Sequence, residues 1–185
     1  MTPVHRSELV DFQTYEDGRT EFRREAMAAK AARRVHVGEH LTFLFENTLT
    51  IRYQIQEMMR AERIVRERDI QHELETYNAV LGGPGELGCT LLIEIDDLAE
   101  RAERLKEWYE LPAHLYARAE DGTKVRPAFD EDQRGDGRLS SVQYLKFSMQ
   151  GRAPVALGAD LPGLTIEAAL NDEQRAALAA DLAGG

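Results

Sequence analysis

The sequence has little cysteine and no long apolar run, and each absence excludes a class of protein. Cys89 is the single cysteine among 185 residues, so a disulfide framework or a zinc or iron–sulfur site built on several cysteines of one chain is excluded. No stretch approaches the roughly 18 apolar residues that a membrane-spanning helix needs, and the first residues have no apolar run of signal-peptide length. A cytoplasmic protein is therefore expected, and a lone thiol suits that reducing compartment.

The charges are unevenly distributed along the chain. There are 23 basic and 33 acidic side chains, which gives a formal net charge of −10. Residues 1–69 are balanced, so the whole excess of negative charge lies in residues 70–185. An acidic half repels phosphates, and the basic residues of the first half alternate with carboxylates, so no nucleic-acid partner is expected. Length and a 43% hydrophobic content predict one globular domain over residues 1–185, with a possible subdivision near 82–86.

Apolar periodicity and capping residues predict an α+β fold. Helices are expected over residues 7–12, 20–32, 49–66, 70–81 and 98–110, with a last helix after Asn171. Strands are expected over residues 35–37, 41–45, 89–95, 114–118, 123–129, 141–147, 154–157 and 164–168. The order is N-terminal helices with an early β-hairpin, then a mostly antiparallel strand-rich C-terminal half and a terminal helix.

Two short motifs do not carry the chemistry that their letters suggest. Gly82-Gly83-Pro84-Gly85 follows a predicted helix, includes a proline without an N–H and lacks the lysine of a phosphate loop. It is therefore interpreted as a helix stop and turn. His36-Val37-Gly38-Glu39-His40 matches a zinc-protease string, but that chemistry needs a helix and the flanking residues alternate as strands do. It is interpreted as a hairpin turn.

Three acidic residues lie within or at the end of apolar stretches, where charged side chains are not normally found. On the predicted helix 49–66, Glu62 falls in the middle of the apolar stripe of Ile51, Ile55, Met58 and Val65. Glu94 lies inside an apolar strand, and Glu46 closes another. A buried carboxylate must be paired, bound to a metal or protonated.

Two interpretations of these carboxylates stay open. In the structural one, each carboxylate pairs with an arginine (Arg33, Arg34, Arg52 or Arg63) or reaches the surface at an element end. In the functional one, Glu46, Glu62 and Glu94 form a cluster that binds a divalent metal or transfers protons. Gln54 borders the same stripe, and Arg33, Arg34 and Arg52 are then candidates for substrate or anion binding. Cys89 opens a buried strand with no basic neighbour in sequence, so an inert core thiol is expected.

The chain resembles a bacterial family known as domain of unknown function 3501. The most specific part is the run FEN, QIQEM and ER at residues 45–47, 54–58 and 62–63, and the similarity spans nearly the whole chain. The resemblance implies a redox or peroxide-stress setting, because genes of this family lie beside those for rubrerythrin and an iron–sulfur protein of the heterodisulfide-reductase type. The chain lacks the Glu-x-x-His pairs of a rubrerythrin di-iron site, so it is not itself a rubrerythrin.

Two functions are expected from these observations. The first is an accessory or interaction protein of an iron-dependent redox or oxidative-stress system, with rubrerythrin or an iron–sulfur redox protein as its partner. The alternative is a small metal-binding protein or enzyme that uses the carboxylates Glu46, Glu62 and Glu94.

Overall fold

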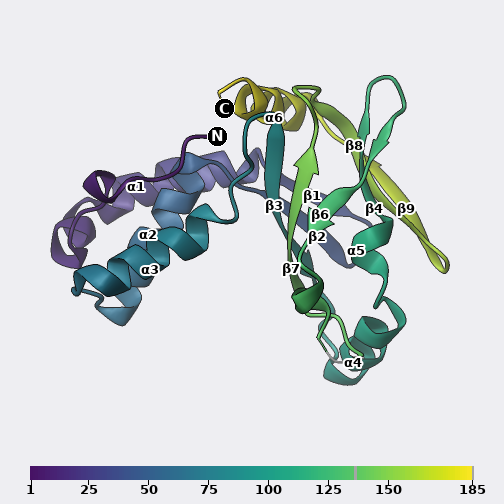
Figure 1. The fold of residues 1–185 in the computed structure, drawn as a ribbon, viewed down its shortest axis with the longest axis horizontal. Coiled ribbons are helices and arrows are strands. Elements are labelled where there is room, and N and C mark those ends of the chain that lie inside the picture. The colour runs from purple at the N-terminus through teal and green to yellow at the C-terminus, as the bar shows by residue number, and fades with distance from the viewer. Residues whose placement is uncertain (136, 185) are drawn as a thin grey trace.

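Two regions with separate apolar cores lie side by side, a three-helix unit and a pair of antiparallel sheets (Figure 1). The structure is a computed structural model that describes residues 1–135 and 137–184. Within those residues, no helix is both long and apolar enough to cross a membrane. The α+β prediction is confirmed, with an early hairpin, a strand-rich second half and a terminal helix.

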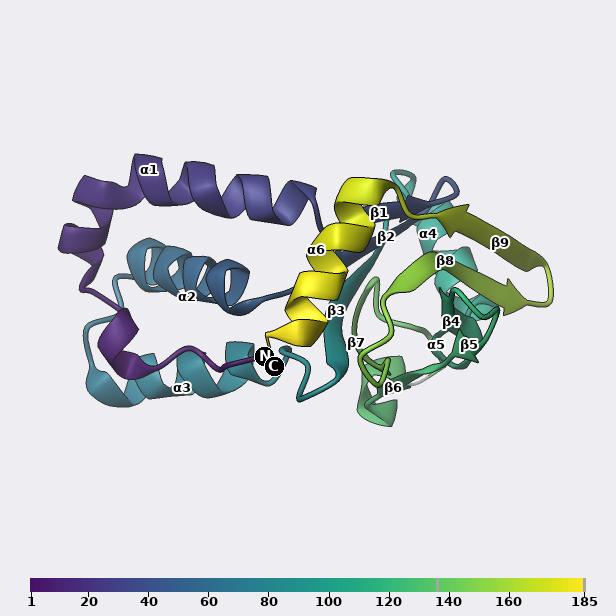
Figure 2. The same cartoon turned by 90° about the horizontal axis from the view of Figure 1, so that it is seen from above.

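The helical unit consists of a short 3₁₀ helix and three α-helices. Their bounds are η1 (Arg6–Glu8), α1 (Phe12–Ala31), α2 (Thr48–Glu62) and α3 (Glu67–Asn78). Helix α2 lies between α1 and α3 (Figure 2). The apolar faces of α2 and α3 bury Ile51, Ile55 and Met59 against Ile70 and Leu74, so the unit has its own core.

Helix α1 corrects the prediction of two separate helices over residues 7–12 and 20–32. The Asp11 carboxylate accepts hydrogen bonds from the N–H groups of Gln13 and Thr14, which starts one continuous helix at Phe12. Gly18 lies inside this helix and weakens it by about 1 kcal/mol relative to alanine. Packing against α2 offsets that loss, because the ring of Phe22 contacts Tyr53 edge-on at a centroid distance of 6.0 Å.

The larger sheet has five antiparallel strands. Their order is β1 (Arg34–Val37), β2 (Leu41–Phe45), β3 (Glu86–Ile93), β7 (Val142–Ser148) and β6 (Pro127–Phe129). The predicted early hairpin is confirmed, since β1 pairs with β2 across a turn in which Gly38 adopts a positive φ of 66°. The chain leaves this sheet after β2, forms α2 and α3, and returns to it in β3.

The second sheet has four antiparallel strands. Their order is β5 (Lys124–Val125), β4 (Leu115–Ala119), β8 (Pro154–Leu161) and β9 (Leu164–Ala169). The prediction of one strand over residues 123–129 is wrong, because the chain changes sheets in this segment: β5 pairs with β4, whereas β6 pairs with β7. Pro127 opens the second piece, and a residue without an N–H suits the first position of an edge strand.

The second core lies between the two sheets and under the terminal helix. The remaining elements are α4 (Leu98–Glu107), α5 (Leu111–His114), η2 (Glu131–Arg134) and α6 (Asp172–Ala183). Phe43, Leu91 and Leu145 from the larger sheet pack with Leu157 from the smaller one and Leu178 from α6. The single-domain prediction for residues 1–185, with a possible subdivision near 82–86, stays a prediction.

Candidate functional site

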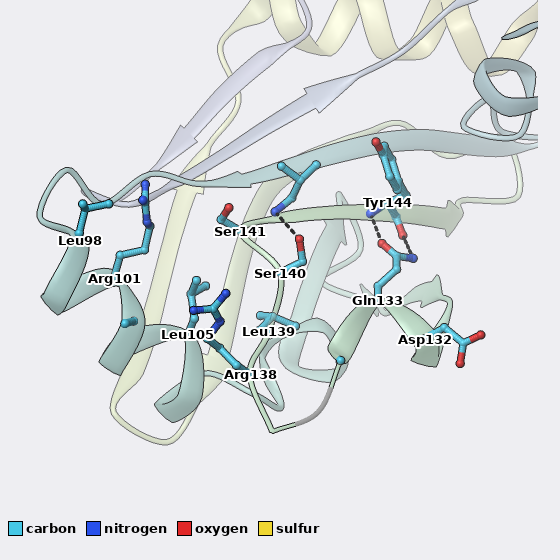
Figure 3. A pocket seen from close by; sticks show the side chains of 13 residues that line it. Leu98, Arg101, Leu105, Asp132, Gln133, Arg138, Leu139, Ser140, Ser141 and Tyr144 are labelled. Carbon is cyan, nitrogen blue, oxygen red and sulfur yellow. Dashed lines mark hydrogen bonds between the residues drawn. The ribbon is translucent and has the colours of Figure 1, made fainter.

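A hollow of about 830 Å³ opens between helix α4, the 3₁₀ helix η2 and the start of strand β7 (Figure 3). Its lining includes apolar side chains exposed to solvent and basic side chains, together with polar and acidic ones. The residues used below are Leu98, Arg101, Gln133, Arg138, Val142 and Tyr144.

Side-chain hydrogen bonds hold the start of β7 in place on this side of the sheet. Strand β6 pairs with β7 only from Leu145 to Phe147. Before that point, the Tyr144 N–H donates to Gln133 Oε1 at 2.6 Å, and Gln133 Nε2 donates to the Tyr144 carbonyl at 3.2 Å. The Val142 N–H donates to Ser140 Oγ at 3.2 Å. An open strand edge attracts other chains, so these side chains close it while Tyr144 stays on the outer face.

Exposed apolar side chains gather at this hollow. Among the described residues, five large apolar side chains are exposed, and three of them line it: Leu98 at 72%, Tyr144 at 48% and Val142 at 36%. Single exposed apolar residues are ordinary, but several beside one depression mark an interaction surface.

The basic side chains of the hollow differ in their ion pairing from other basic side chains nearby. On α4 and η2, Arg104, Lys106 and Arg134 each form ion pairs with nearby carboxylates. In the described part of the chain, Arg101 and Arg138 form none. A guanidinium presents a rigid fork of donors that matches carboxylates and phosphates. The Asp132 carboxylate also lines the hollow and offsets part of this charge.

A second, smaller hollow continues the first on the other side of Tyr144. Its volume is about 310 Å³, and Val80, Phe129 and Lys146 contribute to its lining. Tyr144 and Gln133 line both hollows, and the two hollows together are called here the Tyr144 groove. The groove is therefore bounded by Leu98 and Arg101 at one end and by Val80 at the other.

Of the three carboxylates singled out from the sequence, Glu46 is the buried one. It lies between β2 and α2 with 9% of its surface exposed, and Thr50 Oγ1 donates to its Oε2 at 2.5 Å. Burial raises the pKa of this carboxyl group, and the Thr50 hydrogen bond and the charges of Lys30 and Arg33 offset part of that rise.

Glu62 and Glu94 are exposed at the ends of their elements, which agrees with the structural interpretation and not with a buried carboxylate cluster. Glu62 is the last residue of α2, because the chain turns at Arg63 in the left-handed conformation. The buried stripe of α2 therefore ends at Met59. Glu94 follows the last residue of β3, and its Oε2 accepts a hydrogen bond from Thr42 Oγ1 at 2.5 Å.

The structure does not bring Glu46, Glu62 and Glu94 together into a shared catalytic or metal site. Strands β2 and β3 pair from Leu41 with Ile93 to Phe45 with Cys89, so Glu46 and Glu94 lie at opposite ends of this pair, about 20 Å apart along the strands. Glu62 lies at the far end of α2 from Glu46. Over residues 1–135 and 137–184, no group of three His, Cys, Asp or Glu side chains is placed to hold a metal ion.

The arginines predicted to bind a substrate or an anion do not converge either. Arg33 forms a two-pronged ion pair with Asp181 of helix α6, with both nitrogen–oxygen distances at 2.7 Å. Arg34 is exposed on β1 and lines a different hollow. Arg52 stacks over the ring of Phe22, with its guanidinium carbon 4.7 Å from the centroid. Gln54 is half-buried on α2, beside Tyr77 of α3.

Sequence reasoning missed the residues of the Tyr144 groove. The alternation over residues 141–147 places Tyr144 on the face opposite the buried Leu145 and Phe147. This pattern could have identified Tyr144 as an aromatic side chain on an exposed strand face. Arg101 and Arg138 carried no such signal, because their neighbours on the sequence are charged as well. Only the folded chain shows which of these charges pair.

Comparisons with known proteins place the chain in a family without assigning it an activity. Among curated proteins, none matches the chain. A crystal structure of a protein of unknown function from Burkholderia pseudomallei K96243 has the same fold, with a TM-score of 0.88 and 30% identity over 98% of this chain and 100% of that one. The profile of the family described as "Protein of unknown function (DUF3501)" matches residues 3–182. The chain therefore belongs to this DUF3501 family.

Proposed function

We propose that this protein is a binding module that docks an acidic segment of a partner protein in the Tyr144 groove. The observation that carries this proposal is the meeting of exposed Leu98, Val142 and Tyr144 with Arg101 and Arg138, which lack an ion pair within the described residues. Tyrosine and arginine dominate the residues that supply most of the binding energy at protein interfaces.

Charge favours an acidic partner over a neutral one. Arg101 and Arg138 line the larger hollow and Lys146 the smaller one, against the carboxylates of Asp132 and Asp130. The chain as a whole carries a formal charge of −10. A basic groove on an acidic molecule attracts a partner's carboxylates locally while the remaining surface repels them, which favours one docking orientation. Bidentate pairs between arginine and carboxylate then add geometric specificity.

The groove supports binding better than it supports catalysis. Among the described residues, the lining includes neither histidine nor cysteine, and Ser140 Oγ already accepts the Val142 N–H. Nucleophilic catalysis by a serine needs an adjacent base, which these lining residues do not offer.

The identity of the partner rests on the family resemblance. Rubrerythrin or an iron–sulfur redox protein is the proposed partner, and this chain would act as its accessory protein. Titration of the purified chain with each candidate, followed by calorimetry, tests this part separately. Binding of a rubrerythrin that is unaffected by charge reversal in the groove would contradict the groove as the docking site.

Site-specific photocrosslinking in the native host tests the groove itself. A photoreactive amino acid replaces Leu98 at the rim of the groove, and a control variant carries it at Val65, which is 68% exposed on the helical unit. The same experiment is repeated with Arg101→Glu and Arg138→Glu in the variant that carries the photoreactive residue at position 98.

The expected result is a discrete crosslinked product from position 98 that the Val65 control does not give. Its linked peptide, sequenced by mass spectrometry, should carry several Asp or Glu residues, and charge reversal should abolish the product. Identical products from both positions, or a product that persists after charge reversal, would contradict the proposal. A link to a second copy of this chain would identify the groove as a self-association surface instead.

A further inference from the structure

A separate hollow of about 400 Å³ lies between the end of helix α1 and the outer face of strand β1. It is lined by Met27, Lys30, Ala31, Arg34 and His36. Met27, Lys30 and Ala31 are three and four residues apart and therefore share one face of α1. Arg34 and His36 are two apart on β1 and therefore share one face of the sheet.

A chain of hydrogen bonds fixes the imidazole of His36. Its Nδ1 lies 2.9 Å from Thr42 Oγ1, which is itself 2.5 Å from Glu94 Oε2. A threonine hydroxyl has one hydrogen, and a carboxylate accepts but does not donate. Thr42 therefore donates to Glu94 and accepts from His36, so the proton of the imidazole lies on Nδ1. Thr42, in the middle of this chain, is buried with 1% of its surface exposed, whereas His36 and Glu94 are exposed.

The hollow is rich in positive charge. Within the described residues, neither Lys30 nor Arg34 forms an ion pair. Lys30 Nζ lies over the ring of Tyr53 at 5.5 Å, and the buried Glu46 offsets part of its charge. Arg34 and the outward Nε2 of His36 are the further groups that can meet a ligand.

We propose that this hollow binds a phosphate monoester, independently of the docking groove. Arg34 supplies charge-assisted hydrogen bonds to the phosphate oxygens, and Lys30 adds positive charge to the wall of the hollow. A volume of about 400 Å³ exceeds what a bare phosphate fills, and Met27 and Ala31 form an apolar wall for the organic group of the ester. His36 Nε2 must carry a proton where a phosphate oxygen lies against it, so the ligand brings this proton or it is taken up on binding. The charged groups around this imidazole are Arg34 on its own strand, Lys30 on α1 and, through Thr42, Glu94 just after β3.

Calorimetric titration with phenyl phosphate, inorganic phosphate and benzoate tests the proposal. Phenyl phosphate should bind most tightly, and Arg34→Gln should weaken it by about tenfold or more, since a hydrogen bond to a charged group is lost. Arg66→Gln, which removes an exposed arginine on the helical unit, is the matched control and should leave the affinity unchanged.

The role of His36 has its own readout. The ¹⁵N spectrum of the free protein should show His36 protonated at Nδ1, and the His36 signals should shift with phenyl phosphate. His36→Gln should weaken phenyl phosphate binding and abolish proton exchange with the buffer. Equal affinity of the wild type and Arg34→Gln would overturn the proposal, as would benzoate binding as tightly as phenyl phosphate, or His36 signals that do not move.

Discussion

Arg33 and Asp181 join the end of helix α1 to the last helix of the chain across 148 residues of sequence. The guanidinium donates from Nε and Nη2 to the two carboxylate oxygens, both at 2.7 Å. The two side chains are only 11% and 8% exposed, so the pair is shielded from water and from salt. A third donor, Nη1, binds the Ala29 carbonyl at 3.0 Å, which fixes the arginine to the end of helix α1.

Replacement of Asp181 by alanine should therefore destabilise the protein strongly. Removing one partner of a buried pair leaves an uncompensated charge, and the expected loss is about 3 kcal/mol of unfolding free energy. Urea denaturation measures this loss. The exposed pair of Arg24 and Glu21 provides the control, since Glu21→Ala should change stability by less than about 0.5 kcal/mol. Similar losses in the two variants would contradict the structural role of the buried pair.

Acid should weaken the contact between α1 and α2 through Glu57. Hydrogen bonds from Arg19, together with one from Tyr15, hold the pKa of Glu57 at about 2, although partial burial opposes this. A lowered pKa adds stability above the ordinary value of 4.5, and this stability is lost as the pH falls towards 2. With screening by solvent taken into account, the contribution should be about 1–2 kcal/mol. Glu57→Gln should be destabilised at pH 7 and lose less stability than wild type between pH 5 and pH 2.

Glu46 should have the opposite pH dependence. Because burial raises its pKa in the folded state, this carboxyl group keeps its proton to a higher pH than in the unfolded chain. Its contribution to stability therefore falls as the pH rises above 4.5 and is least favourable above the folded pKa. Glu46→Gln should gain stability relative to wild type between pH 4 and pH 8, as measured by thermal unfolding. A constant difference between the two proteins across this range would show that the pKa of Glu46 is the same in the folded and unfolded chains.

Cys89 should be unreactive in the native protein. The thiol is completely buried in β3, and burial raises its pKa well above the ordinary value, with the nearby Glu46 adding to the effect. Thiol reagents should therefore modify less than a tenth of the protein in the time that modifies the urea-unfolded chain completely. Rapid labelling under native conditions would reveal local opening of the larger sheet around β3.

Local signals in the sequence predicted the elements whose ends are fixed by nearby residues. The terminal helix begins where expected, because Asn171 and Gln174 cap it reciprocally. The early hairpin forms at the position predicted from the alternating apolar residues and from Gly38. These features depend on residues a few positions apart, so periodicity and capping are sufficient to predict them.

The candidate site could not be predicted in the same way, since it depends on distant segments. The angle of Glu62 on an ideal helix put it in the apolar stripe, but the helix ends at that residue and the stripe does not reach it. The Tyr144 groove forms only when α4 and η2 meet the start of β7. That Arg101 and Arg138 form no ion pair with any described residue is evident only once the neighbouring charges have found their partners. Pairing between separate elements was therefore the information that the sequence did not supply.

The insertion of β7 between β3 and β6 has a consequence for protein synthesis. Strand β3 is complete long before its neighbour emerges, because α4, α5 and strands β4, β5 and β6 lie between them in the chain. Until residue 142 leaves the ribosome, the β3 backbone offers a row of unpaired amide and carbonyl groups beside an apolar face. Such an edge is a template for pairing with other chains. Products of premature termination between residues 93 and 142 should therefore aggregate rather than persist as folded fragments.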